Sequence, residues 1–185
     1  MIKKVLLGLT TLTLASSLSA DIKPMIGVGI DGGGDNIARA TVSGDDQEIK
    51  AGAGLSFEGG VAIKTPSIGN KLVTQLLVGY KTDSIDASNG DLEMSRVYIN
   101  AIESYNFGNV SVGAGITYHI TPKFSSSGAG SNAGNADFDS AVGGIAQATY
   151  NFNQHSSLGL RATAIKYDVS KTNQSFDANS AGLYF

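Results

Sequence analysis

Few side chains in this sequence could carry out covalent chemistry. The chain contains no cysteine, which excludes thiol chemistry, and its two histidines are His119 and His155. His155 lies two residues before Ser157, and these are the residue types of a general base and a hydroxyl nucleophile. Catalysis also needs a third group that orients the base, and nothing in the sequence places one beside either histidine. The sequence therefore predicts a protein that is not an enzyme.

Aspartates collect in the polar segments that separate the apolar stretches. Asp31, Asp35, Asp45 and Asp46 bracket the first of these segments, 32–46. Carboxylate oxygens are preferred by Ca²⁺ and Mg²⁺, so these four predict a weak, shared cation site. Their spacing is not that of an EF-hand loop. The alternative interpretation is that aspartate simply favours turns, and we predict no cofactor.

Apolar and polar residues alternate along most of the chain, and the longest alternating stretch is 48–64. Its apolar file consists of Ile49, Ala51, Ala53, Leu55, Phe57, Gly59, Val61 and Ile63. A period of two predicts a β-strand with one apolar and one polar face. Globular strands have about 5–6 residues, whereas a tilted strand crosses a bilayer with about 9–11. We therefore predict one long membrane-crossing strand over 48–64.

Eight such stretches follow one another, at about 23–31, 48–64, 71–83, 92–105, 110–121, 138–152, 158–169 and 176–185. Connections of 15, 8, 16 and 6 residues alternate with short turns. An even number of strands with this alternation predicts an all-β fold, an eight-stranded antiparallel transmembrane β-barrel in an up-and-down meander.

Two of these strands have an ambiguous phase. In 92–105 we favour the phase that places Val97 and Ile99 outward with Glu103, because an acidic residue near the interface costs less than Arg96 near the midplane. In 158–169 the apolar file changes phase between Ala164 and Ile165. Either a one-residue bulge or departure of the strand from lipid would explain that change.

The polar file is rich in glycine and serine, which suits the crowded interior of a narrow barrel. The charged and amide residues on it are Lys50, Glu58, Lys64, Gln75, Lys81, Arg96, Gln147 and Arg161. Buried charges must be paired or hydrated, so we predict ion pairs in the interior, with Glu58 and Arg161 as the first candidate pair near mid-barrel. The alternative is that these charges line a gated, narrow pore.

Aromatic residues fall near both ends of the predicted strands. The outer set is Tyr80, Tyr118, Phe138, Tyr167 and Phe176, and the inner set is Tyr105, Phe107, Tyr150, Phe152 and Phe185. Two aromatic girdles that flank an apolar band are typical of barrels embedded in lipid. A soluble β-sandwich would also pack aromatic residues, but it would not sort them into two girdles.

Residues 1–20 have the pattern of a cleaved secretory signal peptide. Lys3 and Lys4 precede an apolar core that ends in small residues at Ala20, and the barrel domain then covers 21–185. Without Lys3 and Lys4, 11 of the 13 basic residues remain against 16 acidic ones, a net charge of −5. This negative charge argues against binding of nucleic acid.

With these features, the mature chain resembles the small eight-stranded outer-membrane barrels of the OmpA transmembrane-domain, OmpX and opacity-protein kind. The terminal Leu183 and Phe185 resemble the signal that such barrels show to the barrel-assembly machinery, although Asn179 departs from its pattern. The resemblance implies the outer membrane of a Gram-negative cell, with membrane lipid and lipopolysaccharide as partners.

We expect a structural or surface-interaction role through the extracellular loops, and the sequence names no extracellular partner. The first alternative is a narrow, porin-like pore for small solutes. The second is a lipid A-modifying enzyme, because some barrels of this size use His with Ser and a carboxylate. His155 would lie at a periplasmic turn, far from lipid A in the outer leaflet, and His119 would lie near the outer rim.

Overall fold

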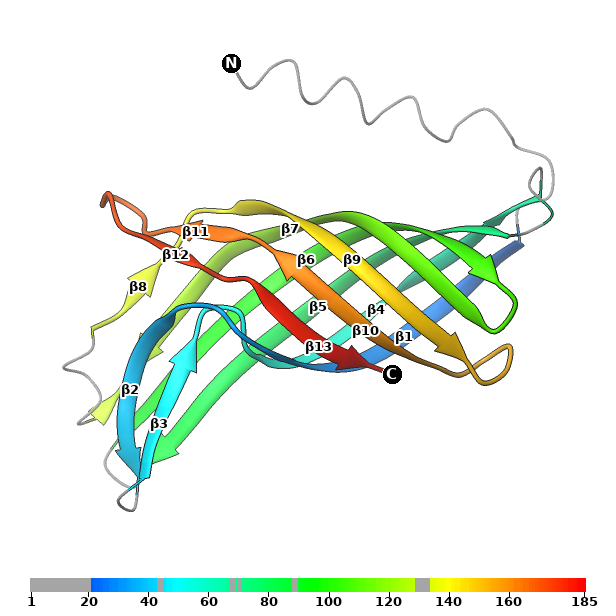
Figure 1. Ribbon diagram of the computed structural model, residues 1–185. Helices are drawn as coiled ribbons and strands as arrows, with labels where there is room; N and C mark the ends of the chain where they lie inside the picture. The colour runs from blue at the N-terminus through cyan, green and yellow to red at the C-terminus, as the bar shows by residue number, and fades with distance from the viewer. Residues whose placement is uncertain (1–20, 43–44, 67–68, 70, 88–89, 129–133) are drawn as a thin grey trace.

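The computed structural model describes residues 21–42, 45–66, 69, 71–87, 90–128 and 134–185. Eight of its strands form one closed sheet in which every strand is antiparallel to both neighbours. They are β1 (Asp21–Gly32), β4 (Gly54–Thr65), β5 (Leu72–Ala87), β6 (Gly90–Phe107), β7 (Val110–Ser126), β9 (Ala141–Asn151), β10 (Ser157–Ala164) and β13 (Ser180–Tyr184). Each strand pairs with the next along the barrel, and β13 pairs with β1. The predicted eight-stranded up-and-down barrel is confirmed (Figure 1). The predicted signal peptide lies outside the described residues.

Five shorter strands lie at one end of the barrel. They are β2 (Asn36–Val42), β3 (Asp45–Lys50), β8 (Ala136–Asp137), β11 (Lys166–Asp168) and β12 (Ser175–Asp177). β2 pairs with β3, β11 pairs with β12, and β8 pairs with the end of β7. We call this end the long-loop end and the opposite one, with turns such as 108–109 and 152–156, the short-turn end (Figure 1).

An apolar band runs around the outside of the barrel. Every barrel strand contributes exposed aliphatic or aromatic residues, among them Ile26, Phe57, Val78, Ile99, Ile116, Val142, Leu160 and Leu183. Side chains alternate between this band and the interior, and the predicted phase of β6 is confirmed because Val97 and Ile99 are exposed while Arg96 is buried. This surface is that of a transmembrane β-barrel. Among the described residues, no helix is long and apolar enough to span a membrane.

The aromatic residues only partly follow the predicted girdles. At the short-turn end, Phe107, Tyr150, Phe152 and Phe185 are exposed as expected. At the other end Tyr80 and Tyr118 are exposed. The prediction was wrong for the rest of the outer set, because Phe138 and Tyr167 are buried and Phe176 packs against them.

These misplaced aromatic residues belong to a second apolar core, which lies inside the long-loop end. Its buried members are Ile49, Ala51, Ile85, Leu92, Met94, Phe124, Phe138, Ile165, Tyr167 and Ala178. They come from the hairpin β2–β3, from the extended ends of β5, β6 and β7, and from the segments around β8, β11 and β12. The long connections therefore form a packed cap on the barrel.

The predicted long strand over 48–64 is interrupted at 51–53. β3 turns inward with the hairpin, so that Ile49 and Ala51 are buried in the second core, and only β4 continues in the barrel wall. Gly54 lies at the turn with φ of +135°, and a Cβ there would collide with the carbonyl oxygen of Thr82. The alternation was correct, but it does not distinguish an apolar file facing lipid from one facing a protein core.

The phase change in the seventh stretch marks a second departure from the wall. β10 ends at Ala164, and Ile165 and Tyr167 turn their side chains into the second core. Asn179 Oδ1 accepts a hydrogen bond from the backbone N–H of Ile165 at 3.0 Å, and the N–H of Ala178 donates to the Ile165 carbonyl. Of the two explanations, the strand leaves the lipid face here.

The seam between the first and last strands is the shortest contact in the wall. β1 and β13 share four register pairs, from Gly29↔Tyr184 to Gly32↔Ala181, whereas β5 and β6 share sixteen. Val28 and Phe185 extend the seam by two backbone hydrogen bonds of 2.9 Å.

Candidate functional site

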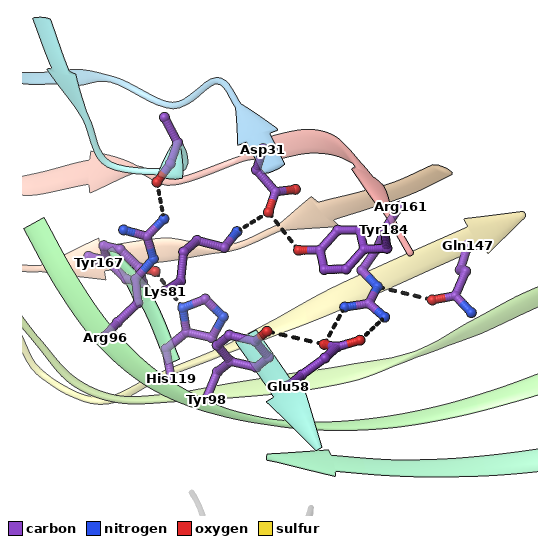
Figure 2. A network of polar contacts seen from close by, with 11 residues as sticks. Asp31, Glu58, Lys81, Arg96, Tyr98, His119, Gln147, Arg161, Tyr167 and Tyr184 are labelled. Atoms are coloured by element: carbon purple, nitrogen blue, oxygen red, sulfur yellow. Dashed lines mark hydrogen bonds and ion pairs between the residues drawn. The ribbon is translucent and has the colours of Figure 1, made fainter. Parts of the chain in front are cut away.

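A network of buried charges fills the middle of the barrel (Figure 2). Arg161 on β10 donates from Nη1 and Nη2 to the two carboxylate oxygens of Glu58 on β4, at 2.8 and 2.9 Å. The two side chains are 4% and 7% exposed. The structure thus brings the candidate pair together across the lumen, although two strands separate β4 from β10 in the wall.

Aromatic and amide groups complete the coordination of this pair. Gln147 accepts a hydrogen bond from Arg161 Nε at 3.0 Å, Tyr98 donates to Glu58 at 3.1 Å, and the Arg161 guanidinium lies 3.8 Å from the centre of the Tyr184 ring. Tyr98 and Tyr184 were not among the sequence candidates. Their inward phase, opposite to Val97 and Leu183, was the signal that could have identified them.

A second ion pair lies nearer the long-loop end. Lys81 Nζ is 2.6 Å from Asp31 Oδ2, and the same oxygen accepts a hydrogen bond from Tyr184 Oη at 2.5 Å. The side chains of Lys81 and Asp31 are almost fully buried, at 5% and 0% exposure. Tyr184 therefore connects the two ion pairs through its ring and its hydroxyl.

Arg96 is the third buried cation, and it binds the interruption between β3 and β4. Its Nη2 donates to the carbonyl oxygen of Ala53 at 2.5 Å. Asp83 accepts a hydrogen bond from the backbone N–H of Lys50 at 3.4 Å, and burial raises the pKa of the Asp83 carboxyl. These two side chains hold the segment that seats the β2–β3 hairpin over the barrel.

The glycines of the polar file make room for the interior tyrosines. A Cβ on Gly79 would overlap the Tyr98 ring, and one on Gly29 would overlap the Tyr184 ring and the Ser56 hydroxyl. Between these rings lies a cavity of about 10 Å³, lined by residues that include Lys81, His119 and Arg161. Side chains therefore fill most of the space around this layer of the lumen.

The two histidines lie far apart in different surroundings. His119 is buried, and its Nδ1 lies 2.5 Å from Tyr167 Oη in the second core. His155 is exposed in the short turn 152–156, where its backbone N–H donates to Asn153. Neither is hydrogen-bonded to a serine or carboxylate in the described contacts, so the described structure gives no catalytic arrangement.

The four aspartates of the predicted cation site do not share one environment. Asp31 is in the interior with Lys81, while Asp35 is exposed and accepts a hydrogen bond from the Asp177 backbone N–H at 2.8 Å. Asp46 is exposed on β3, and the side chain of Asp45 lies outside the described residues. Within the described part of the chain, no three acidic or histidine side chains are grouped as metal ligands. Asp31 therefore lies apart from Asp35 and Asp46, and a cation site on these aspartates stays a prediction.

Two predicted lumen charges lie at the rims instead. Lys50 is paired with Glu48 at 3.6 Å and Lys64 with Asp21 at 3.8 Å, and both lysines are partly exposed. In the hairpin, Arg39 also binds Glu48, and this hydrogen bond lowers the Glu48 pKa. Lys50 faces solvent because β3 leaves the barrel wall, whereas Lys64 stays paired with β1 and β5 but lies at the rim of the short-turn end.

Exposed acidic side chains dominate the long-loop end. Its exposed aspartates are Asp35, Asp46, Asp86, Asp91, Asp137, Asp139, Asp168 and Asp177, and its exposed basic residues are Arg39, Lys123, Lys166 and Lys171. This acidic surface lies on the segments that the second core holds in place.

Comparison with known proteins identifies similar solved structures. Neisserial surface protein A (NspA) has a TM-score of 0.47 and 14% identity, over 90% of this chain and 98% of that chain. Ail, the attachment invasion locus protein of Yersinia pestis, solved with the heparin analogue sucrose octasulfate, has a TM-score of 0.42 and 12% identity, over 91% of this chain and 100% of that chain. No family model and no curated protein matches the sequence. These likenesses describe the strand arrangement and assign no ligand or residue role to this chain.

Proposed function

We propose that this closed transmembrane barrel is an outer-membrane protein of a Gram-negative cell, and that it presents an ordered acidic surface to a partner outside the cell. Longer connections face outward and short turns face the periplasm in such barrels, so the long-loop end is the extracellular one. The barrel then serves as the anchor, and the cap carries the interaction.

The observation that carries this proposal is the second apolar core. A barrel needs only its wall to remain in the membrane, yet ten buried residues here fix the long connections against one another. Surface loops without such a core are mobile, and ordering them costs conformational entropy when a partner binds. A packed cap is therefore suited to presenting a fixed surface.

The interior contacts count against the two alternative functions. A pore needs a continuous path, but the Glu58–Arg161 pair crosses the lumen and the apolar cap lies above it. A lipid A-modifying enzyme needs a histidine that reaches the outer leaflet, but His119 is bonded to Tyr167 inside the barrel.

The charge of the cap points to the chemistry of the partner. Eight exposed aspartates stand against four exposed basic residues on the described cap, so a basic surface, or phosphate groups bridged by divalent cations, would be attracted. A sulfated polyanion would be repelled. Lipopolysaccharide and the barrel-assembly machinery remain proposed partners on the grounds of location alone.

The first experiment separates the anchor from the pore. Purified protein in planar bilayers should show no steady single-channel conductance. In gels it should migrate differently before and after boiling, because all barrel hydrogen bonds lie between strands. Steady conductance would refute the closed interior, and a soluble periplasmic protein would refute the membrane location.

The second experiment tests the acidic cap. Protein in nanodiscs is passed over immobilised basic peptide and over a sulfated polysaccharide, and the triple variant D86N, D91N and D139N is compared with D21N, which changes an aspartate at the short-turn end. We expect retention on the basic peptide to fall in the triple variant only. Equal retention by all three proteins would contradict a role for the cap charge.

A further inference from the structure

An apolar groove lies on the outer wall of the barrel, near the short-turn end. It measures about 360 Å³ and is formed by β7, β9, β10 and β13, of which the last three lie side by side in Figure 1. Its walls are exposed aliphatic and aromatic side chains, namely Val110, Tyr150, Leu158, Leu160 and Leu183. The groove belongs to the apolar band, so it opens toward the hydrocarbon of the membrane.

The groove exists because β9 carries one small residue among large neighbours. Ala148 is flanked in register by Val112 on β7 and Leu160 on β10, and Tyr150 is flanked by Val110 and Leu158. The methyl group of Ala148 is much shorter than these side chains, so the wall is hollow above it. An unfilled hollow forfeits dispersion contacts, and hydrocarbon that enters it regains them.

The outward side chains of β9 stay small toward the middle of the membrane. Beyond Ala148 they are Ala146 and Gly144, both exposed, and a Cβ added to Gly144 would meet nothing within 4 Å. Ala146 is itself flanked in register by Ala114 and Ala162. A long, thin ligand in the groove can therefore continue along β9 without meeting a large side chain.

At its other end the groove reaches the turns 108–109 and 152–156, because Val110 and Leu158 lie at the start of the strands that follow them. The backbone N–H of Asn151 donates to the carbonyl oxygen of Asn109 at 2.7 Å, so the two turns are neighbours. Their exposed hydrogen-bonding side chains are Asn109, Asn153, Gln154 and His155. An apolar groove that ends at exposed polar side chains matches an amphiphile.

We propose that this groove binds one acyl chain of a phospholipid from the leaflet at the short-turn end, and that the two turns contact the headgroup. The acyl chain fills the hollow above Ala148 and lies along β9. Tyr150 lies where the acyl chain joins the headgroup, the level at which tyrosine is enriched in membrane proteins. The site depends on neither the acidic cap nor the orientation of the barrel, so it stands apart from the proposed surface interaction.

Native mass spectrometry tests the site. The protein is refolded in vesicles of phosphatidylethanolamine and phosphatidylglycerol and transferred to a mild detergent, and the retained lipid is counted. We expect one phospholipid per barrel, and about a tenfold smaller ratio of bound to free protein in Ala148→Phe, whose ring occupies the groove. Ala101→Phe, the same change at an outward-facing alanine of β6 outside the groove, should retain the lipid. No retained lipid, equal retention by the two variants, or a lipid-free dimer would overturn the proposal.

A second measurement leaves the floor of the groove intact, in case Ala148→Phe does not fold. The chain has no tryptophan, so Tyr150→Trp introduces a single fluorophore into the groove wall, and Phe107→Trp places one at the same end outside it. In vesicles of phosphatidylcholine with brominated acyl chains, both should be quenched. After dilution into detergent, quenching should persist at position 150 and disappear at position 107. Equal recovery at both positions would mean that the groove holds no lipid of its own.

Discussion

Removing one member of the Glu58–Arg161 pair should destabilise the barrel far more than removing both. Glu58→Gln keeps the shape of the side chain but leaves Arg161 buried without its counter-charge, although Gln147 and the Tyr184 ring remain in contact with it. Loss of one partner of a buried ion pair costs about 3–5 kcal/mol, whereas replacement of the whole pair is often neutral. We therefore expect Glu58→Gln and Arg161→Met each to cost about 3–5 kcal/mol, and the double variant much less than their sum.

The assay is urea unfolding of the barrel in lipid vesicles, followed by circular dichroism and by the gel mobility of unboiled samples. Glu48→Gln is the matched control, because it removes a carboxylate from an arginine pair on the exposed hairpin, where solvent screens the charges and little change is expected. The reasoning fails if Glu58→Gln costs no more than Glu48→Gln, or if the losses of the two single variants simply add in the double variant.

Four further predictions concern the ends of the barrel. Deletion of Phe185, which is 62% exposed, should lower surface abundance in cells more than it lowers stability in detergent, and equal losses would contradict an assembly role. Phe138→Ala should cost about 3–5 kcal/mol and should speed proteolysis at the long-loop end; unchanged cleavage would mean that the cap does not depend on its core. The pKa of Asp83 is raised in the folded state, so Asp83 contributes most to stability at low pH, and this contribution is lost as the pH rises. Asp83→Asn should therefore raise the thermal unfolding midpoint above that of the unaltered protein, and the difference should be larger at about pH 7 than at about pH 4. Removal of Mg²⁺ by a chelator in lipopolysaccharide-containing membranes should lower the midpoint of the unaltered protein more than that of Asp35→Asn with Asp46→Asn, and equal effects would leave turn chemistry as the sufficient explanation.

The alternation of apolar residues was sufficient to predict the barrel itself. Strand number, direction and the lipid face of β7 or β9 follow from a period of two and from the position of the turns. The phase of β6 also followed, once the costs of exposing Arg96 and Glu103 to lipid were compared. In the structure Glu103 faces outward, and Thr74 donates a hydrogen bond to it at 2.7 Å.

The cap could not be predicted, because its apolar residues obey the same pattern as lipid-facing ones. Ile49 and Tyr167 both lie in stretches where apolar and polar residues alternate, as they do in lipid-facing strands. In the structure they face a protein core, which forms only when segments distant in sequence meet. Gly54 was the available local signal for the first departure, but glycine is frequent throughout the polar file. Pairs of interior side chains such as Glu58 and Arg161 depend on whether two side chains are long enough to meet across the lumen, and strand order alone does not give that distance.

The short seam between β1 and β13 has a consequence for how the barrel forms and how long it lasts. Its contacts join residues far apart in the chain, such as Asp31 and Tyr184, which are 153 positions apart. Contacts of such high order form late in folding, and until they form both strands are free edges that can pair wrongly. Once closed, the wall has its fewest register pairs here, so local opening, and the amide exchange that reports it, should begin at this seam. The lifetime of the folded barrel then depends on four register pairs, the two Val28–Phe185 backbone hydrogen bonds and the Tyr184–Asp31 hydrogen bond, while the long strands β5 and β6 remain protected.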